Sequence, residues 1–531
     1  MNRRESVSWG GARIVLSAIF LSASGIVGAQ TLEPVWALHS DGSWQADSVS
    51  MGGEGAEVFS EYGSYLNARV LLSTHDANPP TPVWIDGGTQ LNHSRRVDSA
   101  ALGGVHVSLH QEYTSDALTW LRPVLRKYST STDVPDWIHY SNILIAGHDR
   151  ADVRVSADGS RIVSVVYDSS TNSTVLSVFG SASSTPVNEW SVSTSGAFRA
   201  FEISGDGRKI VLRSELKLII VDLDSGESLL TKYYFSSPFT GGIGISGDGA
   251  TVAMASAQEL HVFSWTGTEY PAPGVFSLEA SSYTPSLAVS TDGSTIALAS
   301  NFYSAPSNVR VTMLSTANLV ASFDQLLTGS GSVANRAGTV KLSWDGGIAA
   351  VGLWGDGGGT IPELLVIDRQ SGEISATADL PGSVMALDLS PNGDRVVVAA
   401  KGSHATEFGG GGGLFLFETC SSDFRLVGAP CLGSTVSFEQ TVTPGTIARV
   451  VASPMLAAVP RIFDGVGTLY LDATQLNFVH EFTEAGADGL VQTPVTIGNN
   501  PALIGTTIYY QGFGLSPRVL TEDTVRMTVL P

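Results

Sequence analysis

A twelve-residue pattern recurs along the chain, and this repetition restricts the possible folds more than any other feature of the sequence. Its copy at residues 289–300 reads VSTDGSTIALAS, and similar segments read VSADGSRIVSVV, ISGDGRKIVLRS, ISGDGATVAMAS, LSWDGGIAAVGL and LSPNGDRVVVAA. The copies are 48, 42, 44, 53 and 47 residues apart, measured between their first serines, Ser156, Ser204, Ser246, Ser290, Ser343 and Ser390. Repeats of this length indicate an array of similar supersecondary units that share a core.

Each copy of the pattern predicts a β-hairpin. The Asp-Gly or Asn-Gly pair tolerates the positive φ angles of a tight turn, and apolar residues precede and follow it at strand spacing. A third strand follows, as in KLIIVDL, ELLVIDR and GLFLFET, and a fourth is more variable. Several short strands in a repeat of about 45 residues indicate the blades of a β-propeller, so the sequence predicts an all-β fold.

The sequence predicts eight blades, with seven as the alternative. Two more variable copies, centred on Ser50 and Ser99, precede the six regular ones. Tryptophan recurs at intervals of 48, 53 and 53 residues, where outer strands are expected, at Trp36, Trp84, Trp137 and Trp190. The Trp36 segment precedes the first complete unit, and the last unit ends after LFLFET. We therefore expect the Trp36 strand to complete the last blade and close the ring, an arrangement favoured over an open solenoid because it hides sheet edges.

The repeats resemble the WD-repeat-like and YVTN-type propeller repeats of secreted bacterial proteins, in which SPDG followed by an apolar strand is the usual signature. LSPNGDRVVVAAKG is the copy that matches best, and the resemblance covers residues 31–419. The repeats lack the regular Trp-Asp and Gly-His signatures of strict WD repeats. The resemblance therefore implies a rigid propeller of the bacterial type, a fold that serves many unrelated functions.

The first 29 residues predict an export signal. Arg3, Arg4 and Arg13 are followed by the apolar run IVLSAIFLSASGIVGA, and Val27 and Ala29 fit a small-residue cleavage site. A membrane anchor is the alternative, which the short run with its Ser and Gly residues disfavours. The sequence thus predicts a secreted, periplasmic or cell-surface protein that keeps no membrane span once the signal is removed.

Two cysteines separate the repeats from a second predicted domain. Cys420 and Cys431 are the only cysteines of the sequence, and in an oxidising compartment such a pair predicts a disulfide that closes the linker 420–431. The predicted organisation is therefore a signal at 1–29, a propeller at 30–419, this linker, and a C-terminal domain at 432–531.

The C-terminal domain is predicted to be a small β-sandwich. About seven short apolar segments, among them STVSFEQ, TLYLD and TTIYYQGF, supply its strands. The stretch IGNNPALIGTTIYYQGF resembles a C-terminal module of many exported proteins of environmental Gram-negative bacteria. The positions that match it are Ile497, Asn499, Pro501, Leu503, Gly505, Tyr509 and Gln511, whereas Gly498 replaces a common Pro. The resemblance leaves open an export or surface-retention tag and an accessory domain.

No catalytic motif stands out, and no cofactor or metal is predicted. The chain contains no G-x-S-x-G, P-loop or H-E-x-x-H, and HEFTE at His480 lacks the second histidine. DLDSG at 222–226 and the glycine run 409–413 fit a turn and a hairpin loop better than a cation site or a phosphate cradle. The ten histidines do not recur at the repeat period. The net charge of −21 disfavours nucleic acid as a partner, since phosphate backbones are repelled.

Strand alternation predicts one cluster of charged side chains. Two residues before the six regular serines lie Arg154, Glu202, Gly244, Ala288, Lys341 and Asp388, which share one side of the predicted first strands. If these strands are innermost, four charged side chains lie near the central channel. Two ion pairs between adjacent blades, Arg154 with Glu202 and Lys341 with Asp388, are favoured over a site for a small polar ligand because opposite charges offset each other's desolvation.

Taken together, the sequence favours an exported, non-catalytic propeller scaffold that binds a protein or glycan partner, with no catalytic residue assigned. The alternative is a propeller enzyme, a lactonase-like hydrolase or a quinoprotein-like oxidoreductase with its site in the channel. Such an enzyme needs convergent acids, bases or metal ligands. A surface or matrix component assembled through the C-terminal domain is a third interpretation.

Overall fold

The computed structural model divides the chain into two compact units, unit 1 (Met1–Thr419) and unit 2 (Cys420–Pro531). It describes residues 29–39, 45–52, 57–64, 67–74, 84–86, 92–114, 120–145, 151–234, 242–278, 282–302, 308–330, 335–404, 411–419, 424–427 and 434–528, with gaps at 195, 215, 257, 357, 370, 455, 464–465, 480–482, 487–488, 504–505 and 516–517. The predicted export signal up to residue 28 and the predicted Cys420–Cys431 disulfide lie outside the described residues. Within them, no helix is long and apolar enough to cross a bilayer.

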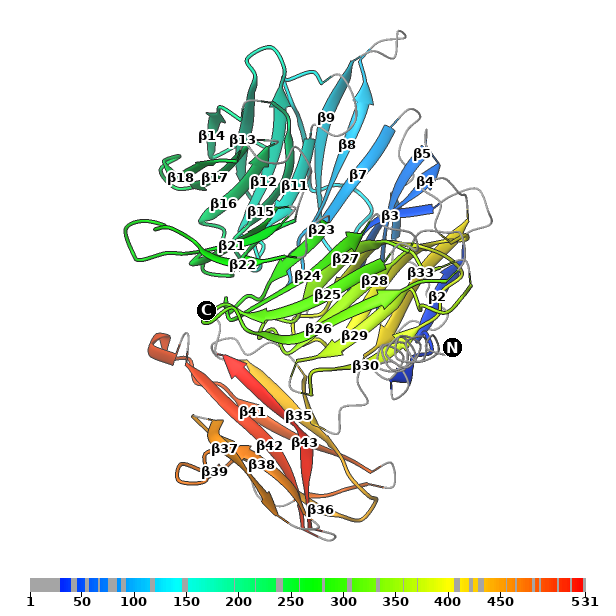
Figure 1. Cartoon of the computed structure of the whole chain (residues 1–531), viewed down its shortest axis with the longest axis vertical. Coiled ribbons are helices and arrows are strands. Elements are labelled where there is room, and N and C mark those ends of the chain that lie inside the picture. Colours follow the sequence, from blue (N-terminus) through cyan, green and yellow to red (C-terminus); the bar gives the residue numbers. More distant parts are fainter. Residues whose placement is uncertain are drawn as a thin grey trace, which may run out of the picture. The chain divides into compact units, whose positions relative to one another are not determined.

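Unit 1 is built from antiparallel sheets of consecutive strands. Four of its sheets are each built from four consecutive strands: β11 (Ala151–Val155), β12 (Arg161–Asp168), β13 (Ser173–Gly180) and β14 (Asn188–Val192); β15 (Phe198–Ile203), β16 (Lys209–Ser214), β17 (Lys217–Asp222) and β18 (Ser228–Tyr233); β19 (Ile243–Ile245), β20 (Thr251–Ala255), β21 (Glu259–Ser264) and β22 (Gly274–Ser277); and β23 (Ser282–Val289), β24 (Thr295–Phe302), β25 (Asn308–Ser315) and β26 (Ala321–Thr328). Figure 1 shows the sheets of unit 1 following one another in chain order, from blue β3 to yellow β33.

The strands between residues 45 and 140 form one larger sheet of two halves. Its strands are β3 (Gln45–Gly52), β4 (Glu57–Ser64), β5 (Asn67–Thr74), β6 (Trp84–Asp86), β7 (Asn92–Ser99), β8 (His106–Tyr113), β9 (Leu121–Tyr128) and β10 (Trp137–Tyr140). A single parallel pair, Asn67 with Asn92, joins β5 to β7. Each half is thus an antiparallel run of four strands like the other sheets.

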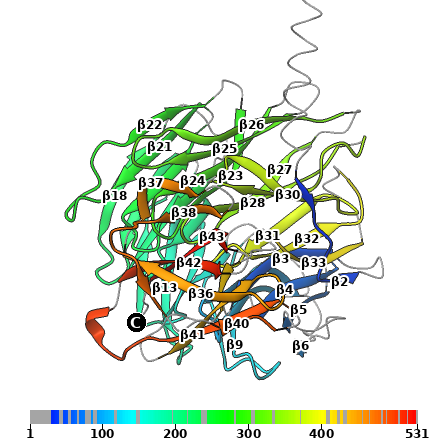
Figure 2. The same cartoon turned by 90° about the horizontal axis from the view of Figure 1, so that it is seen from below.

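Two sheets of unit 1 receive a strand from the N-terminal segment. One contains β27 (Ala337–Leu342), β28 (Ile348–Leu353), β29 (Leu364–Asp368) and β30 (Glu373–Ala378), to which β1 (Gln30–Thr31) adds in parallel. The other contains β31 (Val384–Leu389), β32 (Arg395–Lys401) and β33 (Gly412–Glu418), to which β2 (Trp36–His39) adds with Trp36 opposite Leu416. The Trp36 segment therefore pairs with the sheet that ends the repeat region, as the sequence predicts (Figure 2).

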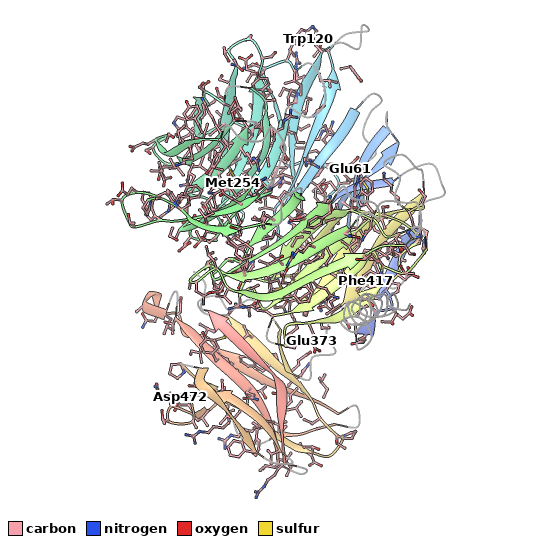
Figure 3. All side chains as sticks on the ribbon, viewed as in Figure 1. Glu61, Trp120, Met254, Glu373, Phe417 and Asp472 are labelled. Atoms are coloured by element: carbon pink, nitrogen blue, oxygen red, sulfur yellow. The ribbon has the colours of Figure 1, made fainter. Side chains whose placement is uncertain are left out.

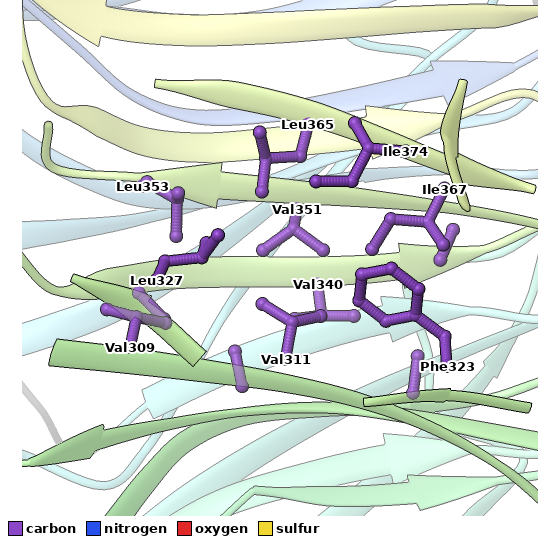
Figure 4. Packing of buried hydrophobic residues seen from close by; sticks show 14 of the residues in the cluster. Val309, Val311, Phe323, Leu327, Val340, Val351, Leu353, Leu365, Ile367 and Ile374 are labelled. Carbon is purple, nitrogen blue, oxygen red and sulfur yellow. The ribbon is translucent and has the colours of Figure 1, made fainter. Parts of the chain in front are cut away.

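The cores of unit 1 lie between neighbouring sheets. One cluster joins β25 and β26, through Val309, Val311 and Phe323, to the next sheet, through Val340 and Val351 (Figure 4). Side chains on both faces of a middle strand are buried, as in β24, where all eight residues are buried. Such strands read as continuous apolar runs because they have no solvent-facing side.

The first strands of the sheets form a continuous series of contacts. β3 contacts β7, β7 contacts β11, and the series continues through β15, β19, β23 and β27 to β31, which contacts β3. Sheets arranged around a common centre by their first strands are the expected arrangement of a propeller.

Unit 2 contains two main antiparallel sheets and a hairpin among its described residues. The first sheet has β34 (Phe424–Val427), β35 (Thr435–Thr441) and β41 (Leu490–Thr496); the second has β36 (Ile447–Ser453), β39 (Asn477–Phe478), β40 (Thr483–Glu484), β42 (Thr507–Leu515) and β43 (Arg518–Thr528); the hairpin is β37 (Leu456–Phe463) with β38 (Gly467–Leu471). Phe438 of the first sheet packs with Val450 and Tyr510 of the second in one buried cluster. Ile497 belongs to this cluster and Leu503, in a short 3-10 helix (Pro501–Leu503), packs against it.

Candidate functional site

A repeated turn fixes how the first strand of each regular unit ends. In the unit of Ser156, the serine Oγ donates to Asp158 Oδ1 (2.7 Å) and accepts the amide hydrogen of Arg161 (3.0 Å), while Gly159 takes a positive φ of 71°. The same two serine bonds recur at Ser204, Ser246, Ser290 and Ser343. At Ser390, where Asn392 replaces the aspartate, Asp394 accepts the serine hydroxyl instead. The turn therefore gives the residue two positions before the serine an equivalent place in each regular unit.

The four charged side chains predicted at this position form two ion pairs. Arg154 donates from Nε and Nη2 to the two carboxylate oxygens of Glu202, at 3.1 and 3.2 Å. Lys341 Nζ lies 3.1 Å from Asp388 Oδ1. Each pair joins neighbouring sheets, as the sequence predicts. Arg154 also bonds Asp152 Oδ1 at 3.2 Å, and its guanidinium lies 5.1 Å from the centre of the Phe201 ring.

The structure adds Asp98 and Ser50 to this set. Asp388 Oδ2 accepts the amide hydrogen of Met51 (2.8 Å) and the hydroxyl of Ser50 (3.3 Å). Ser50 Oγ in turn accepts the amide hydrogen of Ser99 (3.1 Å), and Asp98 Oδ2 accepts that of Val155 (2.7 Å). Asp388, Ser50 and Asp98 thus occupy equivalent places, since each accepts a backbone amide from the next first strand. We call Ser50, Asp98, Arg154, Glu202, Lys341 and Asp388 the central set.

The prediction from the sequence missed Asp98, because it centred the turns of the first two units on the wrong residues. The backbone bonds that surround Ser156 recur around Ala100, whose amide donates to Val105 O while Gly103 N donates to Ala100 O. In the first unit the strand pairs to Gly52, opposite Glu57. The positions equivalent to the anchor serines are therefore Ala100 and Gly52, not Ser99 and Ser50. A search for glycine after the turn, without requiring the serine, would have found this register.

The pKa values of the central set show that its charges interact across several sheets. Burial raises the pKa of Asp98 to about 6, against the attraction of Arg154 and Lys341. The pKa of Lys341 is raised by Asp388 first, against desolvation, and further by Glu202 and Asp98. Lys341 belongs to β27, whereas Glu202 and Asp98 belong to β15 and β7. Asp98 and Lys341 therefore interact with charges beyond the two ion pairs.

A serine, a histidine and a carboxylate also meet at the turn between β7 and β8. Ser99 Oγ lies 3.0 Å from His106 Nδ1, and His106 Nε2 lies 3.3 Å from Glu57 Oε2. Glu57 also accepts the hydroxyl of Thr130 (2.8 Å) and the amide hydrogen of Gly104 (3.3 Å). Because the His106 side chain is fully buried, a substrate has no access to it. These groups hold the turn of the second unit in place of the missing serine and aspartate.

A second titratable pair joins the sheets of β29 and β32. The buried Glu363 carboxylate accepts the amide hydrogen of Leu380 (2.7 Å), and its other oxygen lies 3.0 Å from His404 Nδ1. Burial raises the pKa of Glu363 to about 8, and nearby Asp379 contributes in the same direction. Among the described residues, no three His, Cys, Asp or Glu side chains gather as a metal-binding group. His480 lies outside the described residues.

Comparisons with known proteins bear on the fold. No protein family model matches the chain, and no curated protein matches it. Among solved structures, the C-terminal WD40 domain of Sif2 is similar, with a TM-score of 0.51 and 13% identity. The match covers 73% of this chain and 99% of that domain. At this identity the similarity shows the fold alone, a WD-repeat-like β-propeller.

Proposed function

We propose that the chain is an exported, non-catalytic propeller scaffold that binds a protein or glycan partner. The observation that carries this proposal is the uninterrupted series of contacts from β3 to β31 and back to β3, together with the similarity to a WD40 domain. A propeller is a rigid support for loops and edges, which suits a binding protein. Its ligand depends on the surface and not on the fold.

In this proposal the propeller has eight blades and the N-terminal segment closes the ring. Three observations support closure: β2 lies in the sheet of β33, Val35 N donates to Leu416 O (2.8 Å), and Leu32 N donates to Thr377 O (2.7 Å) in the preceding sheet. Leu32 is buried between these two sheets. The hydrogen bonds between the N-terminal segment and the last two sheets thereby hold the two ends of the repeat region together and stabilise the closed ring.

The central set is proposed to line the channel and to hold neighbouring blades together. The mutual neutralisation of Arg154 with Glu202 and of Lys341 with Asp388 supports this structural role. Lys341 keeps 47% of its side chain exposed. A small polar ligand at the channel mouth therefore stays a second candidate role for these residues.

Export, the disulfide and the C-terminal sandwich complete the proposal. Arg3, Arg4 and the apolar run before Gln30 support removal of a signal and a secreted, periplasmic or surface location. The sequence spacing of Cys420 and Cys431 supports a disulfide at the start of unit 2. The cluster shared by β35, β36 and β42 supports a sandwich that acts as accessory or retention domain.

A binding screen combined with an activity screen tests the proposed function. The purified full chain is applied to a glycan array and to a random-peptide display library, and is also assayed for turnover of lactones, esters and quinone-linked alcohols. We expect selected glycans or peptides that free propeller competes for, and no turnover. Turnover that is lost in an Arg154→Gln or Asp388→Asn variant would support the enzyme instead, and failure to select any ligand would contradict the scaffold.

A further inference from the structure

The outer edge of the β7–β10 half-sheet has open backbone groups. β10 is its last strand and, among the described residues, pairs with β9 alone. Tyr140 lies opposite Val124 and Ile138 opposite Arg126, and Ser141 N donates to Pro123 O (3.0 Å) in the same register. Since hydrogen-bonded and non-hydrogen-bonded pairs alternate in an antiparallel ladder, the N–H and C=O groups of Ile138 and Tyr140 point away from β9.

Large apolar side chains accompany this open edge. Ile138 and Tyr140 are 36% and 49% exposed. Leu144, just after the strand, and Trp120, just before β9, are exposed as well, and Figure 3 labels Trp120 at the end of this sheet. Arg122 is exposed and shares a face with Ile138 and Tyr140, because strand residues two apart and cross-strand partners lie on one face. We call Trp120, Arg122, Ile138, Tyr140 and Leu144 the β10 edge patch.

Two other outer strands of unit 1, β14 and β18, carry residues that discourage pairing. β14 exposes Glu189 and Ser191, and β18 exposes Lys232 beside hydroxyl side chains. Charged and polar residues protect open edges in this way. β30 is apolar at Ile374, Ala376 and Ala378, but there the chain itself adds β1 as a further strand. The apolar edge at β30 is therefore covered by an extended segment, whereas the outer strands β10 and β22, which expose Ile138 and Val275, receive no further strand among the described residues.

The charges beside β10 favour an acidic occupant. Arg126 pairs with Glu112 at 3.4 Å, and the Cα of Glu112 lies opposite that of Arg122 in the ladder. No carboxylate of the described residues pairs with the Arg122 side chain. Arg126 thus engages Glu112, and Arg122 remains an exposed cation beside β10 on a chain whose net charge is −21. An acidic group on a partner is attracted to Arg122 here and repelled over most of the remaining surface.

We propose that an extended peptide segment of a protein partner adds to β10 as a fifth strand. Its backbone pairs with Ile138 and Tyr140, its apolar side chains pack on these residues, and an acidic residue meets Arg122. The inference rests on the proposed scaffold function and assigns the partner to one surface of it.

Labelled peptides test this inference on the full chain. The probe is a fluorescein-labelled peptide of alternating Val and Thr with a Glu at each end, and its counterpart carries a Lys at each end. We expect anisotropy to report binding of the Glu peptide, and hydrogen exchange to show slower exchange of the Ile138 and Tyr140 amides. Ile138→Lys and Tyr140→Lys each weaken binding about tenfold or more, because an apolar contact is lost and a charge faces the edge. Arg122→Gln abolishes the preference for the Glu peptide.

The matched control is Val275→Lys, which places the same charge at an exposed valine on the outer strand β22. It should leave binding within about twofold of the parent chain. Thermal unfolding verifies that each variant is folded. The inference would be overturned if Val275→Lys weakened peptide binding as much as Ile138→Lys and Tyr140→Lys, or if the peptide did not slow hydrogen exchange of the Ile138 and Tyr140 amides. If the screens above select a partner that folded β10 variants still bind, the inference fails and the scaffold function stands; if no partner and no peptide binds, both fail.

Discussion

Replacement of Asp98 by asparagine tests the electrostatics of the central set. The Asp98 carboxylate accepts the amide hydrogen of Val155 at 2.7 Å, and its Oδ1 lies 3.4 Å from Ser50 Oγ. Burial raises its pKa from 3.8 to about 6, although Arg154 and Lys341 attract the ionised form. The Asp98→Asn variant keeps an oxygen that can accept from Val155 and removes the ionisation.

The sign of the effect follows from proton uptake. Between pH 3.8 and about pH 6 the folded chain retains a proton that the unfolded chain releases, so the Asp98 contribution to stability falls as the pH rises through this window. A rise of about two units corresponds to about 3 kcal/mol. Because Asp98 is only partly shielded from solvent, we expect about 1–3 kcal/mol. Relative to the parent chain, Asp98→Asn should therefore gain this amount of stability between pH 4 and pH 7.

Urea unfolding at intervals from pH 4 to pH 8 measures this difference. Asp324→Asn is the contrasting control, because the hydrogen bond from Arg310 (2.7 Å) lowers the pKa of Asp324. This partly exposed pair should contribute at most about 1 kcal/mol at pH 7, and the contribution should disappear as the pH falls below 3.8. A relative stability of Asp98→Asn that stays constant, or falls, between pH 4 and pH 7 would refute the assignment.

Three further substitutions test individual contacts. Gly226→Ala should lower the free energy of unfolding by about 2–4 kcal/mol, because Gly226 has φ +73° and a Cβ would lie 2.0 Å from Trp190 Nε1. Gly359→Ala, at φ +61° in open space, should cost about 1–2 kcal/mol, and equal losses would contradict a role for Trp190. Trp36→Ala should cost about 3–5 kcal/mol in the thermal unfolding of unit 1, because the buried ring anchors β2; an unchanged melting temperature would argue against closure through this strand. As the pH rises from 4.5 to about 8, the free energy of unfolding of the parent chain should fall by about 2–4 kcal/mol because of Glu363, and Glu363→Gln should remove this fall. Urea unfolding measures it, and parallel pH profiles of the variant and the parent chain would contradict the prediction.

The fold was predictable where the determining chemistry is local. The turn of Ser156 is held by Asp158 and Arg161 within six residues, so a short segment carries all the information. The recurring tryptophans were correctly assigned to outer strands where they are described, and the structure gives the reason for their spacing. Trp137 Nε1 donates to Ser181 O (3.0 Å) and Trp190 packs over Gly226, so each ring reaches the next sheet.

The register of the first two units depended on information that the sequence pattern does not contain. Ala100 has no hydroxyl and Leu102 has no carboxylate, so the motif disappears while the backbone bonds of the turn persist. The side-chain roles pass to Ser99, His106 and Glu57, which come from different strands. Only the positive φ of Gly103 leaves a trace in the sequence, as a glycine. Asp98 was therefore assigned to no site, although it is equivalent to Arg154.

Packing between the first strands also explains why charge is unevenly distributed at the centre. A Cβ on Gly244 would lie 2.9 Å from Val289 Cγ2, so β19 and β23 approach too closely for a charged side chain at this position. The charges consequently gather on the other first strands, where Arg154 and Lys341 are already paired with Glu202 and Asp388. A ligand that binds at the central set would have to compete with these bonds. At β10, in contrast, apolar side chains and Arg122 are exposed, and among the described residues no further strand pairs with β10 and no carboxylate pairs with Arg122. For this reason we propose that the protein partner binds at this edge rather than at the central set.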